Sequence, residues 1–142
     1  MFAVNYLAVF IAALVSMILG MVWYSSALFG RQWTALMGID PNDKEKMEKM
    51  KKESGLPKFE WAITAIGTFI MAYILALFFI WLGVEDPING MIFAIFIWVG
   101  FIATATFTNV LFEKKSKKLW AINSGYHFVA LLFMSSILTF LK

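Results

Sequence analysis

Residues 61–84 read WAITAIGTFIMAYILALFFIWLGV and contain no Asp, Glu, Lys or Arg. A helix needs about 20 predominantly apolar residues to cross a hydrocarbon core about 30 Å thick, so this stretch is long enough to span a membrane. Residues 2–30, 87–112 and 119–141 are equally free of charged side chains. A buried helix of a soluble protein is usually shorter and carries a polar face. The pattern therefore predicts four transmembrane helices.

The composition agrees with this prediction. Of 142 residues, 61% are hydrophobic and only 15% are charged, whereas soluble domains are roughly half apolar and a quarter charged. We expect one all-α domain, residues 1–142, whose four transmembrane helices form an antiparallel bundle. By the same length rule the spans cover about residues 4–25, 60–83, 88–112 and 119–141, with a helical cytoplasmic loop at residues 26–58. Cysteine is absent, which excludes disulfides, thiol catalysis and cysteine-bound metals.

The basic residues predict the orientation. The loop between the first two spans and the loop between the last two carry nearly all of them: Arg31, Lys44, Lys46, Lys49, Lys51, Lys52 and Lys58, then Lys114, Lys115, Lys117 and Lys118. The middle connection has only Glu85 and Asp86, and Lys142 alone follows the last span. Basic loops stay in the cytoplasm, so both termini are expected outside, in a bacterial inner or plasma membrane. The net charge of +3 thus reflects topology, and no nucleic-acid partner is expected.

The first cytoplasmic loop has helical patterns of its own. Phe29, Trp33 and Leu36 recur at helical spacing, which predicts a short amphipathic helix on the membrane surface that stops at Gly38. Asp40 followed by Pro41 predicts the start of a second, lysine-rich helix that ends near Ser54 and Gly55. That helix is interpreted as a solvated face near anionic headgroups, with docking of a partner as the alternative.

Polar side chains inside the spans are costly, so their positions carry information. The third span contains Thr104, Thr108 and Asn109, and the fourth contains Asn123 and His127. The two spans run in opposite directions, and a rise of about 1.5 Å per residue places Thr104 and His127 at similar depth, about 12 Å from the inner interface. Thr108, Asn109 and Asn123 form a tier at about 6 Å. We expect these side chains to meet along one seam.

Two stripes of small residues predict close helix packing. They are Ala8, Ala12, Ser16 and Gly20 in the first span, and Thr64, Thr68, Ala72 and Ala76 in the second. Packing alone explains them. Trp98 lies deep in the third span, where its indole N–H either finds a hydrogen-bond partner or stays unpaired at a cost.

His127 is the only histidine in the chain. It is a candidate for structural hydrogen bonding, for handling a solute or proton, or, less favoured, for catalysis. No acid lies in any span to orient it as a base, and it lacks the partners of a metal site. No nucleophile–base pair or phosphate loop is recognisable, so no cofactor is expected and an enzyme is the least favoured reading.

Three segments carry a family resemblance: Val4-Asn5-Tyr6, Trp23-Tyr24-Ser25 with Leu28-Phe29-Gly30 and Trp33, and Ile122-Asn123-Ser124-Gly125-Tyr126-His127. On these motifs the chain resembles the membrane-protein family catalogued as domain of unknown function 1761, although similar sequences usually have proline where this chain has Ser26. The resemblance implies four spans and a membrane location. It implies no established activity, so no catalytic residue is assigned. Both longer motifs fall at the cytoplasmic side and are expected to frame one cavity.

Two functions are weighed. In the first, a small polar solute or water is bound or conducted by a cavity formed by His127, Asn123, Thr104, Thr108 and Asn109 and rimmed by Trp23 and Tyr24. Four helices enclose little space, so a pathway is expected to need a homo-oligomer packed through the small-residue stripes. In the second, the chain is a structural or accessory subunit whose lysine-rich loop docks a partner or anionic lipid. An enzyme acting on a lipid or quinone comes third.

Overall fold

The computed structural model describes residues 3–53 and 58–141, so Lys142 and the predicted helix end near Ser54 and Gly55 lie outside it. The chain is 81% helical and has no strand in its described part, which confirms the all-α prediction. Four helical segments have the length and hydropathy needed to cross a membrane. They are Tyr6–Trp23, Trp61–Leu82, Pro87–Phe112 and Lys117–Phe140.

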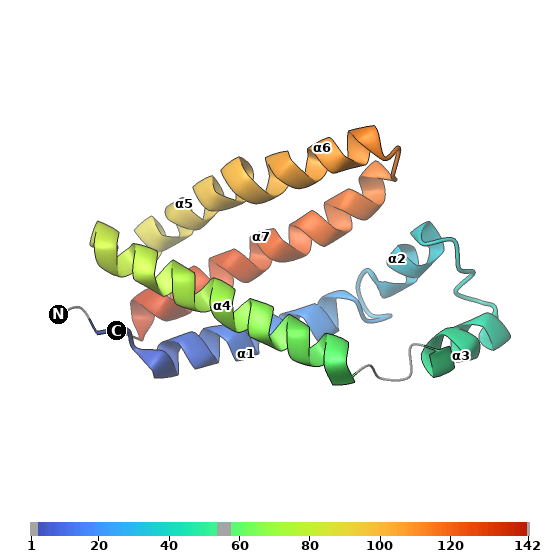
Figure 1. Ribbon diagram of the computed structural model, residues 1–142, viewed down its shortest axis with the longest axis horizontal. Coiled ribbons are helices and arrows are strands. Elements are labelled where there is room, and N and C mark those ends of the chain that lie inside the picture. Colours follow the sequence, from blue (N-terminus) through green and yellow to red (C-terminus); the bar gives the residue numbers. More distant parts are fainter. Residues whose placement is uncertain (1–2, 54–57, 142) are drawn as a thin grey trace.

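The described residues contain seven α-helices and one π-helix, joined by turns. In chain order they are α1 (Tyr6–Trp23), α2 (Gly30–Leu36), α3 (Lys44–Glu53), α4 (Lys58–Leu82), α5 (Pro87–Ile97), the π-helix η1 (Trp98–Ala103), α6 (Thr104–Phe112) and α7 (Lys117–Phe140). The third span is thus a continuous rod formed by α5, η1 and α6. We call the end that carries α2, α3 and the α6–α7 turn the lysine-bearing end; the termini lie at the opposite end (Figure 1).

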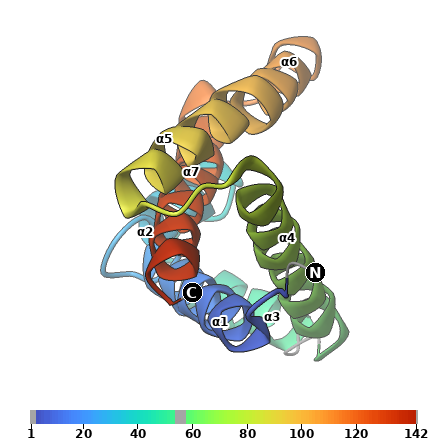
Figure 2. The same cartoon turned by 90° about the vertical axis from the view of Figure 1, so that its left-hand side faces the viewer.

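Neighbouring spans run antiparallel, but the bundle is open. Helix α7 packs mainly against α5 on one side and α1 on the other, and α4 packs mainly against α1. Figure 2 shows the result end-on, with α5 and α4 flanking the central α7 and α1 from different sides. The core cluster accordingly combines residues of α1, α4 and α7, among them Val9, Leu75 and Met134. Span three buries the smallest share of its residues, because it packs mainly against one other helix, α7.

The small-residue stripes pack within the chain. Ala8, Ala12 and Ser16 are almost completely buried in α1, as are Thr68, Ala72 and Ala76 in α4, while Thr64 at the end of the stripe is exposed. Small side chains allow helix backbones to approach closely, which is the predicted use of both stripes. The prediction of close packing is confirmed, and these surfaces are occupied inside one chain.

Side-chain caps explain where the spans begin. Asn5 caps α1, since its Oδ1 accepts from the Ala8 N–H at 3.1 Å, and its Nδ2 donates to the Leu141 carbonyl at 2.6 Å. That second bond ties the start of α1 to the end of α7. Asp86 caps α5 by accepting from the Asn89 N–H at 3.1 Å, with Pro87 at the first helical position.

The lysine-rich helix begins later than predicted. Asp40 Oδ1 accepts from the Asn42 N–H at 2.9 Å, which makes a turn through Pro41 rather than a helix start. Asp43 is the residue that caps α3, because its Oδ1 accepts from the Lys46 N–H at 3.1 Å. That backbone hydrogen bond lowers the pKa of the Asp43 carboxyl. The short helix α2, by contrast, ends as predicted before Gly38, which adopts a φ of 84°.

The π-helix in the middle of span three was not predicted. A π turn inserts an extra residue into an α-helix and rotates everything beyond it around the helix axis. Here it starts at Trp98 and ends just before Thr104, whose Oγ1 donates to the Val99 carbonyl five residues back at 2.6 Å. The face that α6 presents to α7 is therefore not the one that a regular helix would present.

Gly30 is required by the tight turn between α1 and α2. The Gly30 N–H donates to the Ser25 carbonyl at 2.9 Å, and a Cβ at this position would meet the carbonyls of Tyr24 and Ser25. Both contacts would be with backbone atoms, so a side chain at position 30 could be accommodated only if the backbone of the turn moved.

We expect Gly30→Ala to lower the stability of the protein in detergent by about 1–3 kcal/mol, the usual cost of overpacking. Gly67→Ala is the matched control, since nothing lies within 4 Å of a Cβ there, and it should be neutral or stabilising by up to about 1 kcal/mol. Thermal unfolding followed by circular dichroism measures both. Equal melting temperatures for the two variants would contradict this account of the turn.

Candidate functional site

The two longer sequence motifs meet where α1 ends and α7 begins. The Trp23 indole N–H donates to the Ile122 carbonyl at 3.0 Å, and the Tyr24 hydroxyl donates to Asn123 Oδ1 at 3.0 Å. Gly125 makes this approach possible, because a Cβ there would lie 3.3 Å from the Trp23 ring. Motif residues separated by about a hundred positions thus form one junction, whereas the sequence predicted that they frame a cavity.

Aromatic rings extend this junction to α2 and to the middle of α1. The Tyr24 ring contacts Trp33 edge-on at a centroid distance of 5.9 Å, and Tyr126 at 5.8 Å. The Tyr126 hydroxyl in turn donates to the Ser16 carbonyl at 3.0 Å, with its ring against Gly20. These contacts anchor α2 and hold α1 and α7 in a fixed register.

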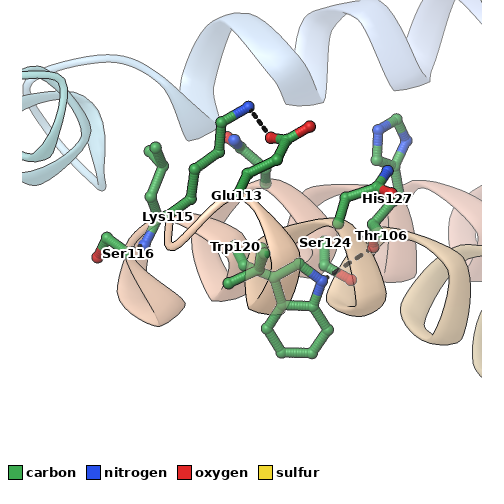
Figure 3. A pocket seen from close by; sticks show the side chains of 11 residues that line it. Thr106, Glu113, Lys115, Ser116, Trp120, Ser124 and His127 are labelled. Atoms are coloured by element: carbon green, nitrogen blue, oxygen red, sulfur yellow. Dashed lines mark hydrogen bonds and ion pairs between the residues drawn. The ribbon is translucent and has the colours of Figure 1, made fainter.

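A cavity of about 260 Å³ lies between α6 and α7 at the lysine-bearing end. Figure 3 shows the side chains that line it: Thr106, Asn109, Val110, Glu113, Lys115, Ser116, Leu119, Trp120, Asn123, Ser124 and His127. Three of the predicted binding residues, Asn109, Asn123 and His127, are therefore brought together.

Thr104 and Thr108 do not face this cavity, so their predicted place in the seam is wrong. Both are exposed, and each donates to a carbonyl of its own helix, Thr104 to Val99 and Thr108 to Thr104. The reason is the π-helix. Gly90 and Ala94 are buried at the α5–α7 interface, and a regular period of about 3.6 residues from them would bring Thr104 and Thr108 to α7. The extra residue in η1 brings Thr106 and Asn109 there instead.

Trp98 and Trp120 hold span three to α7 on either side of the cavity. Trp98 Nε1 donates to the Ser124 carbonyl at 2.8 Å, so the indole N–H has the partner that the sequence left open. Trp120 Nε1 donates to Thr106 Oγ1 at 2.8 Å. The sequence did not predict Thr106 as a site residue. In an uninterrupted α-helix, its spacing from Ala94 would turn its side chain away from α7.

Three side-chain atoms are buried without a hydrogen-bond partner among the described residues: Ser124 Oγ, His127 Nδ1 and Ser135 Oγ. Ser124 and His127 are residues of the cavity lining, whereas Ser135 lies elsewhere on α7. Ser124 is only 3% exposed. An unpaired buried polar group costs roughly 1–3 kcal/mol, and most such groups in folded proteins are paired. Within the cavity lining, Ser124 and His127 therefore have hydrogen-bonding capacity that the described chain does not use.

Among the described residues of the lining, only Glu113 and Lys115 are charged, and they form an ion pair with each other in the α6–α7 turn. Figure 3 shows this pair on the same side of the cavity as the His127 ring, with Trp120 on the opposite side. The rest of the polar lining consists of hydroxyl, carboxamide and imidazole groups. The described residues hold no group of three or more His, Asp or Glu side chains that could bind a metal.

A second hollow, of about 510 Å³, lies on the other side of Asn123 and is lined by Tyr24, Trp33, Thr34, Met47 and Asn123. Tyr24 thus borders this hollow and not the α6–α7 cavity, and Trp23 borders neither. The predicted rim of Trp23 and Tyr24 around one cavity is corrected accordingly. Asn123 lines both spaces, and its hydrogen bond with Tyr24 lies between them.

A family model described as a protein of unknown function, DUF1761, matches residues 7–139. The chain belongs to this family. The match covers all four spans and both longer motifs, and confirms the resemblance drawn from them. Comparison with curated proteins and comparison with solved structures each found no match. Membership in DUF1761 assigns no activity, so the chemistry of the site must be argued from its own residues.

The Tyr24–Asn123 hydrogen bond should be measurable as a coupling energy. In a double-mutant cycle with Tyr24→Phe and Asn123→Ala we expect about 0.5–1.5 kcal/mol of coupling, the range of a partly buried hydrogen bond. Denaturant unfolding in detergent supplies the four free energies. Tyr6→Phe with Asn123→Ala is the control cycle, since Tyr6 lies at the other end of α1, and should couple by less than about 0.5 kcal/mol. Additive effects in the first cycle would argue against the observed geometry.

Proposed function

We propose that this DUF1761 protein is a multi-pass membrane protein that binds or conducts a small polar solute through the α6–α7 cavity. The observation that carries the proposal is the pair of unpartnered buried atoms, Ser124 Oγ and His127 Nδ1, that line the cavity. Polar groups in a membrane interior usually pair with one another or with backbone carbonyls, and they mark pathways for solutes or ions. Asn109 and Asn123 add further hydrogen-bonding groups to the same lining.

The proposed orientation places the lysine-bearing end in the cytoplasm and both termini outside, within a bacterial inner or plasma membrane. Helix α3, the α6–α7 turn and the start of α7 carry most of the lysines, whereas the turn between α4 and α5 carries Glu85 and Asp86. The whole chain forms one transmembrane domain. In this orientation the cavity opens toward the cytoplasm.

The proposed assembly is a homo-oligomer, because four helices enclose only small cavities. The stripes of α1 and α4 are already used inside the chain, so they cannot also join two copies. Span three offers the alternative surface: Gly100, Thr104 and Thr108 are exposed along one side of it. Small residues on an exposed transmembrane face allow a second helix to approach closely.

A structural or accessory role is the second candidate. It is favoured by the hydrogen bonds that join α1 to α7 through Trp23 and Tyr24, and by α3, whose described lysines are exposed and which has few contacts with other helices. In that role the exposed lysines would bind an anionic lipid surface or an acidic partner. The polar residues of α6 and α7 would then only hold the helices together.

Flux in proteoliposomes separates the two roles. With a panel of small solutes, we expect permeation that disappears in His127→Ala and persists in Gly67→Ala, where an added Cβ meets nothing within 4 Å and which lies outside the cavity. His127→Leu should then retain the wild-type melting temperature. No flux or thermal shift with any solute, together with a lower melting temperature in His127→Leu, would favour the accessory role instead.

The absence of cysteine makes the orientation easy to test. Single cysteines at Glu85 and Lys49 report on opposite ends of the molecule. In intact cells a membrane-impermeant maleimide should label Glu85→Cys, and should label Lys49→Cys only after permeabilisation. The reverse pattern would invert the proposed topology and turn the cavity outward.

A further inference from the structure

We propose that the occupant of the α6–α7 cavity is an uncharged molecule that both donates and accepts hydrogen bonds, held by Ser124 and His127. This inference rests on the proposed function, since it names the class of solute that the same cavity would take. It is carried by three features of the lining: the position of its charges, the hydrogen-bonding capacity of its polar groups, and its apolar wall.

Charge is confined to one end of the cavity. Glu113 and Lys115 lie in the turn between α6 and α7 and neutralise each other. Helix α7 starts at Lys117, so a rise of about 1.5 Å per residue places Ser124 roughly 10 Å and His127 roughly 15 Å further along its axis. Among the described residues that line the cavity, Glu113 and Lys115 are the only Asp, Glu, Lys or Arg, and they are paired with each other. An ion there would lose its hydration without gaining a counter-charge, which costs several kcal/mol or more.

The polar groups of the lining can both donate hydrogen bonds to a bound molecule and accept them from it. The Ser124 hydroxyl can do both, and a neutral imidazole presents one N–H donor and one acceptor nitrogen. Asn123 Oδ1 already accepts from Tyr24, so its NH₂ group is left to donate. Asn109 offers a whole carboxamide. Carboxamides, ureas and alcohols match this set, whereas an apolar molecule would leave Ser124 and His127 unpaired.

The remaining wall is apolar. Val110, Leu119 and the Trp120 ring face the same space. At about 30 Å³ per water molecule, the cavity of about 260 Å³ has the bulk of roughly eight waters. A compact neutral amide with an apolar or aromatic body therefore fits the lining better than a fully polar solute of equal size.

Benzamide, benzoate and benzamidinium test this inference, because the three probes share one shape and differ in charge. Binding to the protein in nanodiscs would be measured by calorimetry at pH 8, where an ordinary imidazole is neutral. We expect benzamide to bind at least about tenfold more tightly than either charged probe. That difference in affinity corresponds to about one or two well-placed hydrogen bonds. Tighter or equal binding of a charged probe would overturn the inference while leaving the cavity as a binding site.

Ser124→Ala provides the second readout. Because Ser124 Oγ is buried and unpaired in the described structure, its removal should leave the melting temperature of the ligand-free protein unchanged or raised, and should weaken benzamide binding about tenfold. Ser135→Ala is the matched control, because it removes another buried, unpaired hydroxyl that lies outside the cavity, and it should leave benzamide binding unchanged. If Ser124→Ala is destabilised but binds benzamide normally, the Ser124 hydroxyl serves only the fold and the inference is overturned.

If none of the three probes binds while solute flux that depends on His127 persists, the inference fails and the proposed function stands.

Discussion

Hydrocarbon provides no hydrogen bonds, so every polar group that enters it must find a partner in the chain or be left at a cost. The four spans follow this constraint closely. Serine and threonine hydroxyls donate back to carbonyls of their own helix, as in Ser16 to Ala12 and Thr139 to Ser135. Three tryptophans carry their indole N–H groups across to a neighbouring helix, Trp23 to Ile122, Trp98 to Ser124 and Trp120 to Thr106. The aromatic residues therefore define helix register as well as depth.

Against this background of paired groups, the π-helix in span three has a consequence for the site. By adding a residue between Trp98 and Ala103 it turns the threonines Thr104 and Thr108 outward and directs Thr106 and Asn109 toward α7. The hydroxyl of Thr106 is then taken by Trp120, but Asn109 remains in the lining. A π turn is marginal in itself and persists where tertiary contacts hold it, as the hydrogen bond from Trp98 to Ser124 does here.

Sequence alone was sufficient for the four long apolar helices and the packing stripes, and it found both motifs that meet at the α1–α7 junction, although not the way in which they meet. Hydrophobic run length and small-residue spacing depend on local composition, so they survive without knowledge of the partners. The sequence did not predict which face of α6 packs against α7, because nothing in the residues around Gly100 indicates the π turn. Regular helical periodicity then selects Thr104 and Thr108 instead of Thr106. The start of α3 was also misplaced, since Asp40 and Asp43 are both competent caps and only the turn through Pro41 decides between them. Orientation depends on the membrane and is argued from the lysines alone.

The contrast between paired and unpaired polar groups bears most directly on function. If the polar residues of α6 and α7 served only to hold helices together, the most buried of them should be the best satisfied, because an unpaired group there destabilises the fold. Thr139 in α7 follows that rule, since its Oγ1 donates to the Ser135 carbonyl at 2.7 Å, but Ser124 Oγ, His127 Nδ1 and Ser135 Oγ are buried without a partner in the described chain. Ser135 lies outside the α6–α7 cavity, so an unpaired buried hydroxyl does not by itself mark the site; Ser124 and His127 differ from it because both line the cavity. Under the proposed function, a molecule that enters from the lysine-bearing end would supply hydrogen bonds to these two residues that the chain does not.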